Sequence, residues 1–171
     1  MTSAPLLSST TRAGAFLARV LILPAILLAA APMHAQSLSS GYVFAGATFG
    51  SHPVQGAGRF GVGLDFHLAS QFDLGGELGT IFKNDAGILG SANLSYHFTR
   101  SRRHEEWDPF LVAGVSAARF AGTGGAWINL GAGVNYWFAS RAALRGEFKG
   151  YAGGQDLGGF GEVRFGVTFR P

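Results

Sequence analysis

Charged residues recur at even spacings within otherwise apolar segments of this chain. Nine of them follow this pattern: Arg59, Asp65, Asp73, Glu77, Arg145, Glu147, Lys149, Glu162 and Arg164. Side chains two positions apart lie on one face of a β-strand, so each segment presents its charges to one side of a sheet. Opposite charges placed in this way suit ion pairing between neighbouring strands. We expect the centre of such a network at four residues: Arg145, Glu147, Glu162 and Arg164.

A serine and a histidine share one face of another segment and could act as nucleophile and base. They are Ser95 and His97. Residues two apart on a strand are separated by about 7 Å, which is too far for the direct hydrogen bond that activates a serine. The sequence therefore favours polar filling over catalysis at this pair and predicts no catalytic residue.

Composition excludes several other kinds of site. The chain contains no cysteine, so disulfides, zinc–thiolate sites and thiol catalysis are ruled out. The histidines His52, His67 and His104 form no pair with a recognised metal-ligand spacing, and no cofactor motif is present. Beyond residue 35 the chain has 11 basic and 10 acidic residues, a balance that gives no case for binding nucleic acid.

The first 35 residues have the pattern of a secretory signal peptide. Two arginines precede an apolar run from Val20 to Ala31, and small residues follow up to Ala35. The run is shorter than the roughly 20 residues of a transmembrane helix, and a proline interrupts it. The sequence predicts cleavage after Ala35, which leaves one domain at residues 36–171.

Eight later segments alternate apolar residues with polar residues or glycine, as β-strands do. They are residues 41–49, 57–68, 72–82, 88–98, 109–120, 126–138, 142–151 and 159–170. Most are close to the 9–11 residues of a tilted membrane-spanning strand, and eight is an even number. No later stretch is apolar for long enough to be a membrane helix, and a closed barrel is the other way to span lipid. The sequence predicts an all-β, eight-stranded, antiparallel, up-and-down transmembrane β-barrel.

The apolar stripes predict which side of each strand faces lipid. In residues 60–68 the stripe is Phe60, Val62, Leu64, Phe66 and Leu68, with charges and glycines between. A soluble, lipocalin-like barrel would bury these side chains instead. The first and fifth segments are apolar on both faces. For the fifth we expect Leu111, Ala113, Val115 and Ala117 to face outward; the facing of the first stays open.

Aromatic residues gather near both ends of the predicted strands, as in the girdles of membrane barrels. One set is Phe66, Phe72, Phe98, Phe110, Tyr136, Phe138 and Phe169, and the other is Phe49, Phe60, Phe82, Phe120 and Phe160. We expect these rings at the two membrane interfaces.

With these stripes assembled, residues 41–170 resemble the small outer-membrane β-barrel family of the OmpA and OmpX type. The resemblance depends on Asn-Leu-Gly-Ala-Gly-Val-Asn-Tyr at 129–136, Leu-Arg-Gly-Glu-Phe-Lys at 144–149, and the closing Phe-Gly-Val-Thr-Phe-Arg. It implies a bacterial outer-membrane protein that contacts outer-membrane lipids and is inserted by the barrel-assembly machinery. We expect a monomer.

Eight strands enclose only enough space for side chains, so the inward charges are expected to form a salt-bridged, mostly closed lumen. A structural envelope component is the favoured function. The alternative is a narrow, porin-like passive channel for small solutes, because inward glycines remove side-chain volume: Gly61, Gly63, Gly75, Gly79, Gly131 and Gly133. A lipid A-modifying enzyme and a surface adhesin are less favoured, the latter because the predicted outer loops are short.

Overall fold

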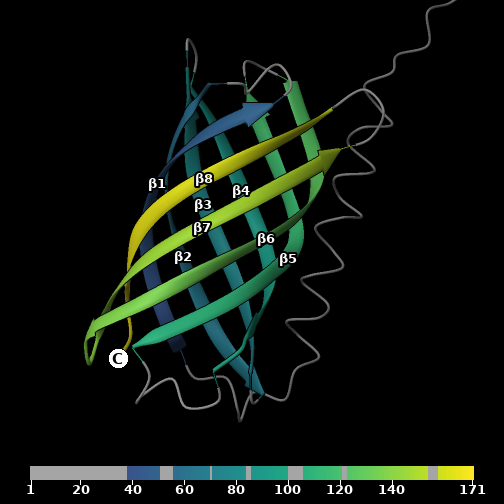
Figure 1. Ribbon diagram of the computed structural model, residues 1–171. Coiled ribbons are helices and arrows are strands. Elements are labelled where there is room, and N and C mark those ends of the chain that lie inside the picture. The colour runs from purple at the N-terminus through teal and green to yellow at the C-terminus, as the bar shows by residue number, and fades with distance from the viewer. Residues whose placement is uncertain are drawn as a thin grey trace, which may run out of the picture. The chain divides into compact units, whose positions relative to one another are not determined.

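The computed structural model describes seven stretches of the chain, residues 38–50, 56–69, 71–83, 86–99, 106–120, 123–153 and 158–171. They form eight strands: β1 (Leu38–Gly50), β2 (Gly58–Ala69), β3 (Phe72–Phe82), β4 (Ala86–His97), β5 (Trp107–Phe120), β6 (Thr123–Ala139), β7 (Ala142–Gly153) and β8 (Gly159–Phe169). The strands build one closed antiparallel barrel (Figure 1). The predicted fold class is confirmed; the predicted signal peptide lies outside the described residues.

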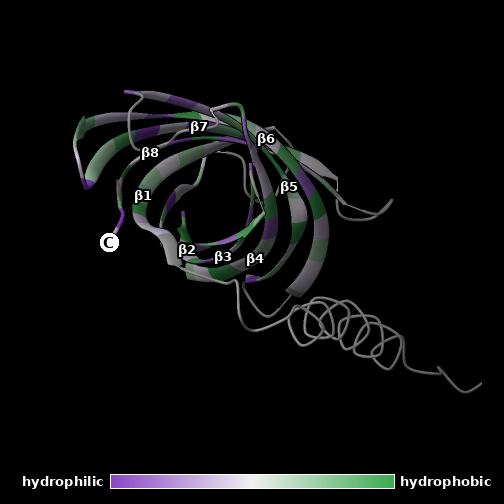
Figure 2. Cartoon of the chain, turned by 90° about the horizontal axis from the view of Figure 1, so that it is seen from below, coloured by the Kyte–Doolittle hydropathy of each residue, from purple (hydrophilic) through white to green (hydrophobic). Residues whose placement is uncertain are grey.

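Every strand pairs with its neighbours in the chain, and β1 pairs with β8 to close the ring (Figure 2). Gly41 lies opposite Phe169 at one end of this closing pair, and Gly50 lies opposite Phe160 at the other. We call the first the terminal end and the second the far end. Closure leaves no strand edge unpaired, as a lipid environment requires. Among the residues described, no helix is long and apolar enough to cross a membrane.

Side chains alternate along the strands with the apolar ones outside and the charged ones inside. On β3, for example, Phe72, Leu78 and Phe82 are exposed, whereas Asp73 and Glu77 are buried. Bands of opposite hydropathy alternate along the strands in Figure 2. This arrangement is the inverse of a soluble barrel and agrees with the predicted stripes.

Aromatic–glycine pairs decide the facing of the two strands that are apolar on both sides. On β1, Tyr42 and Phe44 point inward, opposite Gly63 and Gly61 of β2. On β5, Phe110 points inward opposite a glycine of β6. A ring lies over the backbone of a directly opposed glycine because no Cβ stands in its way. The outward stripe of β5 is the one predicted from Leu111.

Two of the expected girdle aromatics are inside the barrel, which corrects the sequence prediction. Phe110 is 1% exposed and Phe160 is 7% exposed. Both occupy inward positions in the alternation of their strands. A position near the end of a strand therefore does not determine whether the ring points into or out of the barrel. Most of the others are exposed: Phe49, Phe60, Phe72, Phe82, Phe98, Phe138 and Phe169. Phe66 and Tyr136 are half-buried, and the side chain of Phe120 lies outside the described part.

Two turns at the terminal end are tighter than predicted. The sequence suggests three-residue connections, but Ala69 pairs with Phe72 and Ala139 pairs with Ala142. An irregularity in the register just before each turn absorbs the extra residue. The bulge keeps the apolar stripe on the outside, so the predicted parity holds.

Candidate functional site

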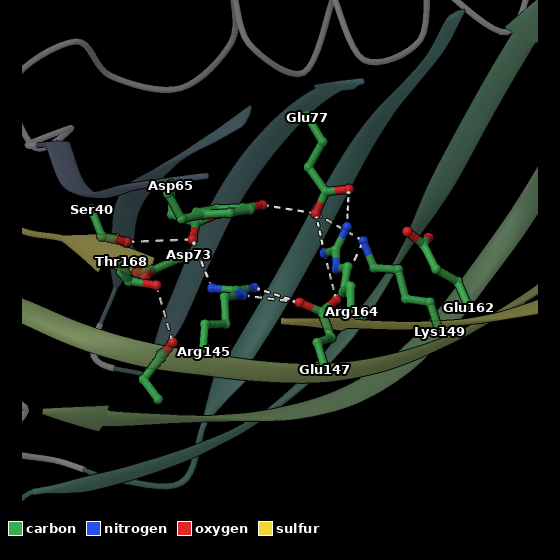
Figure 3. A network of polar contacts seen from close by, with 12 residues as sticks. Ser40, Asp65, Asp73, Glu77, Arg145, Glu147, Lys149, Glu162, Arg164 and Thr168 are labelled. Atoms are coloured by element: carbon green, nitrogen blue, oxygen red, sulfur yellow. Dashed lines mark hydrogen bonds and ion pairs between the residues drawn. The ribbon is translucent and has the colours of Figure 1, made fainter. Parts of the chain in front are cut away.

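The lumen collects the nine charged residues singled out by their spacing. None is more than 6% exposed, because each occupies an inward position on β2, β3, β7 or β8. Eight of the nine form ion pairs with one another, and most of them appear in the close view of the lumen (Figure 3). The ninth, Asp73, pairs with the histidines His67 and His97. We call the other eight the lumen network.

Glu77 of β3 is the hub of the lumen network. Its carboxylate accepts hydrogen bonds from Lys149 at 2.9 Å, from Arg164 through two nitrogens, and from the hydroxyl of Tyr42 at 2.8 Å. Arg59 lies 3.8 Å from the same carboxylate. The contacts with Lys149 and Arg164 cross the lumen, since β3 does not neighbour β7 or β8. The sequence placed the centre on β7 and β8 and missed this cross-lumen partner.

The expected cluster on β7 and β8 forms in part. Arg145 donates to Glu147 at 3.0 Å, and Arg164 donates to the other oxygen of Glu147 at 2.7 Å. Glu162 takes a different partner: it accepts from Arg59 and from the hydroxyl of Tyr151. The network is thus one chain of contacts running from β7 through β8 to β2 and β3.

Aromatic rings inside the barrel support the guanidinium groups. The guanidinium of Arg145 lies 4.2 Å from the ring centre of Tyr42 and 4.3 Å from that of Phe110. The ring of Phe44 lies beneath Arg164 at 4.4 Å and Arg59 at 5.0 Å. Cation–π contacts in a dehydrated site contribute about 2 kcal/mol or more each. The spacing of the charges does not predict that these rings lie inside the barrel. The glycines opposite the rings on the neighbouring strands were the sequence feature that could have indicated it.

A second polar cluster lies at the terminal end around His97. Its Nδ1 is 2.9 Å from both carboxylate oxygens of Asp108, and its Nε2 is 3.6 Å from Asp73. Thr99 donates to Asp108 at 2.7 Å, and the partly exposed His67 contacts Asp73 at 3.1 Å. One buried imidazole therefore separates two buried carboxylates. Asp108 was not among the predicted site residues.

The serine that could have used this histidine is Ser95, which is buried on the same inner face of β4. Both ring nitrogens of His97 face carboxylates, Nδ1 that of Asp108 and Nε2 that of Asp73, and not the serine hydroxyl. Within the described ranges, no group of three or more histidine and acidic residues is arranged to hold a metal ion.

The inward glycines make room for neighbouring side chains rather than for an open path. A Cβ on Gly63 would overlap the ring of Tyr42, and a Cβ on Gly75 would overlap the carboxylate of Asp65. At Gly131 it would lie 2.7 Å from Cγ of a network lysine. Gly61, Gly79 and Gly133 are equally crowded, by Phe44, by backbone and by Phe110. The side-chain volume that these glycines give up is therefore occupied.

Solved structures with this architecture share the fold at low sequence identity. The N-terminal β-barrel domain of Pseudomonas aeruginosa OprF superposes with a TM-score of 0.62 at 19% identity, covering 78% of this chain and 98% of that domain. Neisserial surface protein A gives 0.56 at 15% identity, covering 78% and 96%. The outer membrane enzyme PagL gives 0.52 at 15% identity, covering 78% and 100%. No family model and no curated protein matches the chain.

This chain has the fold of the small eight-stranded outer-membrane β-barrels, which confirms the predicted resemblance at the level of fold. One protein with this fold, PagL, is an enzyme, so the fold alone does not determine function. Function depends instead on the residues of the lumen and the outer surface.

Proposed function

We propose that this chain is a bacterial outer-membrane β-barrel that serves as a structural envelope component with a closed, salt-bridged lumen. The observation that carries the proposal is the inverted distribution of side chains on a closed barrel. Large apolar side chains ring the outside: Val62, Leu64, Leu78, Ile88, Leu94, Leu111, Ile128, Leu130, Leu144, Phe148 and Phe165 are all exposed. In water such a belt would be an aggregation surface, whereas in lipid it is the required one.

Three features support a closed lumen. The lumen network crosses the interior from β3 to β7 and β8 through Glu77. Aromatic rings stack against its guanidinium groups. The inward glycines face side chains that use the vacated space. An eight-stranded barrel is just wide enough for side chains to fill, so these contacts support a closed lumen.

A narrow passive channel is the second candidate, favoured by one observation. Both side-chain polar atoms of Asn93 and the Oδ1 of Asn129 are buried without a hydrogen-bond partner. Buried polar atoms of this kind are usually satisfied by internal water. A polar wall on β4 and β6 could thus hold water beside the lumen network.

We propose structural roles for Ser95 and His97 and no catalytic one, because His97 is held between Asp73 and Asp108 rather than against the serine hydroxyl. A monomer is proposed because each strand finds both of its partners within the chain. Outer-membrane lipids would contact the apolar belt, the barrel-assembly machinery would insert the chain, and a cleaved signal peptide would direct its export.

Expression of the full chain in a Gram-negative host tests the membrane assignment. We expect the protein in the outer-membrane fraction, in a form whose gel mobility shifts on boiling. Leu64→Lys places a charge in the middle of the belt, where lysine costs about 2–4 kcal/mol, and should prevent insertion. Thr80→Lys is the matched control near the far end of an outward stripe and should insert. Insertion of Leu64→Lys at the level of the unmodified protein would contradict the proposal.

A further inference from the structure

An apolar layer lies across the far end of the barrel, beyond the lumen network. Five buried residues form it: Ala57, Ile81, Leu89, Tyr151 and Phe160. Ala118 and Trp127 pack against it. These residues stand at or beside the far ends of β2 to β8, so nearly the whole circumference contributes.

The aromatic members of the layer are in ring contact. Tyr151 and Phe160 stack with ring centroids 4.3 Å apart and an interplanar angle of 9°. Trp127 meets Phe160 edge-on at 6.0 Å. The rings come from β6, β7 and β8, while Ile81 and Leu89 come from the facing strands β3 and β4. The layer therefore closes on itself across the mouth.

Polar groups lie directly beneath the layer. On β4, Ser91 is the next inward residue after Leu89, and its hydroxyl is 2.8 Å from that of Ser116. Asn129 donates to Ser116 at 2.8 Å. The amide of Asn93 is 3% exposed and has no hydrogen-bond partner for either polar atom. This wall favours hydration, and the layer above it does not.

The layer also rests on the lumen network. The hydroxyl of Tyr151 accepts a hydrogen bond from Arg59 at 2.8 Å and donates one to Glu162 at 2.8 Å, while its ring stacks on Phe160. Tyr151 thus belongs to both structures. Its hydroxyl contacts charged residues of the network, and its ring packs among apolar residues of the layer.

We propose that this layer is a dry seal, a barrier to water and small ions at the far end that acts separately from the lumen network. An apolar constriction excludes water and with it hydrated ions, so a polar interior beneath it stays isolated from that side. The inference rests on the proposed membrane-spanning barrel with a closed lumen. It adds that two different barriers stand in series.

A single introduced cysteine tests the seal, because the natural sequence contains none. Ser91→Cys places a thiol just beneath the layer with little change in size. The protein is reconstituted into lipid vesicles and exposed to an external, membrane-impermeant cationic methanethiosulfonate. Lys83→Cys, an exposed position beside the far end of β3, reports the fraction of molecules whose far end faces the reagent.

The seal is opened with Phe160→Ala and Trp127→Ala, which remove two of the three rings and leave Tyr151 with its network contacts. The matched control is Phe148→Ala with Phe165→Ala, which removes two outward rings from β7 and β8. Boiling-dependent gel mobility verifies folding. If the double variant does not fold, Phe160→Ala alone gives the same comparison.

With the seal intact, Ser91→Cys should label far more slowly than Lys83→Cys, and opening the seal should speed labelling by at least about tenfold. The outward control should leave the rate unchanged. Rapid labelling with the seal intact would overturn the proposal, and so would continued protection in the folded seal variant. Ion conductance of the unmodified protein tests the closed lumen separately, since it does not depend on which layer excludes the reagent.

Discussion

Replacing the hub carboxylate with its amide, Glu77→Gln, should destabilise the barrel more than any other conservative change in the lumen. The carboxylate accepts four hydrogen bonds, two from Arg164, one from Lys149 and one from Tyr42. Glutamine keeps the shape but loses the negative charge that offsets the nearby cations. Their positive charges would then remain buried with less compensation.

The expected loss follows from these contacts. A hydrogen bond to a charged group contributes about 1.5–3 kcal/mol, and removing one partner of a buried ion pair costs about 3–5 kcal/mol. Because the four bonds share one carboxylate, they do not add, and we expect about 3–5 kcal/mol for Glu77→Gln. Adding Lys149→Met to this variant removes a positive charge as well and should recover part of the loss.

Urea unfolding in lipid vesicles, followed by the fluorescence of the three tryptophans, measures these differences. The matched control is Glu106→Gln, the same chemical change at an exposed position, which should leave the midpoint unchanged. A Glu77→Gln protein as stable as the control, or a double variant no more stable than Glu77→Gln, would refute the assignment of Glu77 as the hub.

Two further changes test the packing of the lumen by the same unfolding measurement. Gly63→Ala should destabilise the protein by about 1–3 kcal/mol because the added Cβ overlaps the inward ring of Tyr42. Gly76→Ala is the control: this position points outward into open space, and the change should be nearly neutral. Equal effects of the two changes would show that the tyrosine ring does not lie over Gly63. His97→Gln should cost about 1–3 kcal/mol because two buried carboxylates lose their shared partner. His67→Gln, whose side chain is 37% exposed, should cost less, and the reverse order would contradict the placement of His97 between the two acids.

The architecture was predictable because alternation is a local property of the chain. On β8, for example, Arg164 is buried between the exposed apolar residues Val163 and Phe165, so parity alone separates the two faces there. Where both faces are apolar, as on β1, parity gives no answer. The pairing of Tyr42 with Gly63 resolves the question, but it depends on the register between strands, which no single segment contains.

The inward positions of Phe110 and Phe160 show which of two sequence signals is stronger. Their positions near strand ends suggested interfacial girdles. Phe110 is adjacent to Leu111, which points outward on β5, so its ring must point inward. Phe160 is two positions from Glu162, which points inward on β8, so its ring must point inward as well. The alternation of the pleat fixes direction, whereas position along the strand sets only height.

The centre of the network could not be read from the sequence for a different reason. Parity places Glu77 and Lys149 in the lumen but gives no information on their relative heights. Their 2.9 Å contact joins strands β3 and β7, which share no backbone hydrogen bonds. The tilt and stagger of the closed barrel bring them to one level, and these are properties of the whole assembly.

The most direct measurement of the central claim, that the lumen network closes this barrel, is ion conductance in a planar lipid bilayer. The unmodified protein and the seal variant Phe160→Ala, Trp127→Ala should both be silent, since the network remains in each. Adding Arg145→Ala and Glu147→Ala to the seal variant removes an ion pair from the network and should produce discrete current steps. Current through the unmodified protein, or through the seal variant with the network intact, would contradict the account.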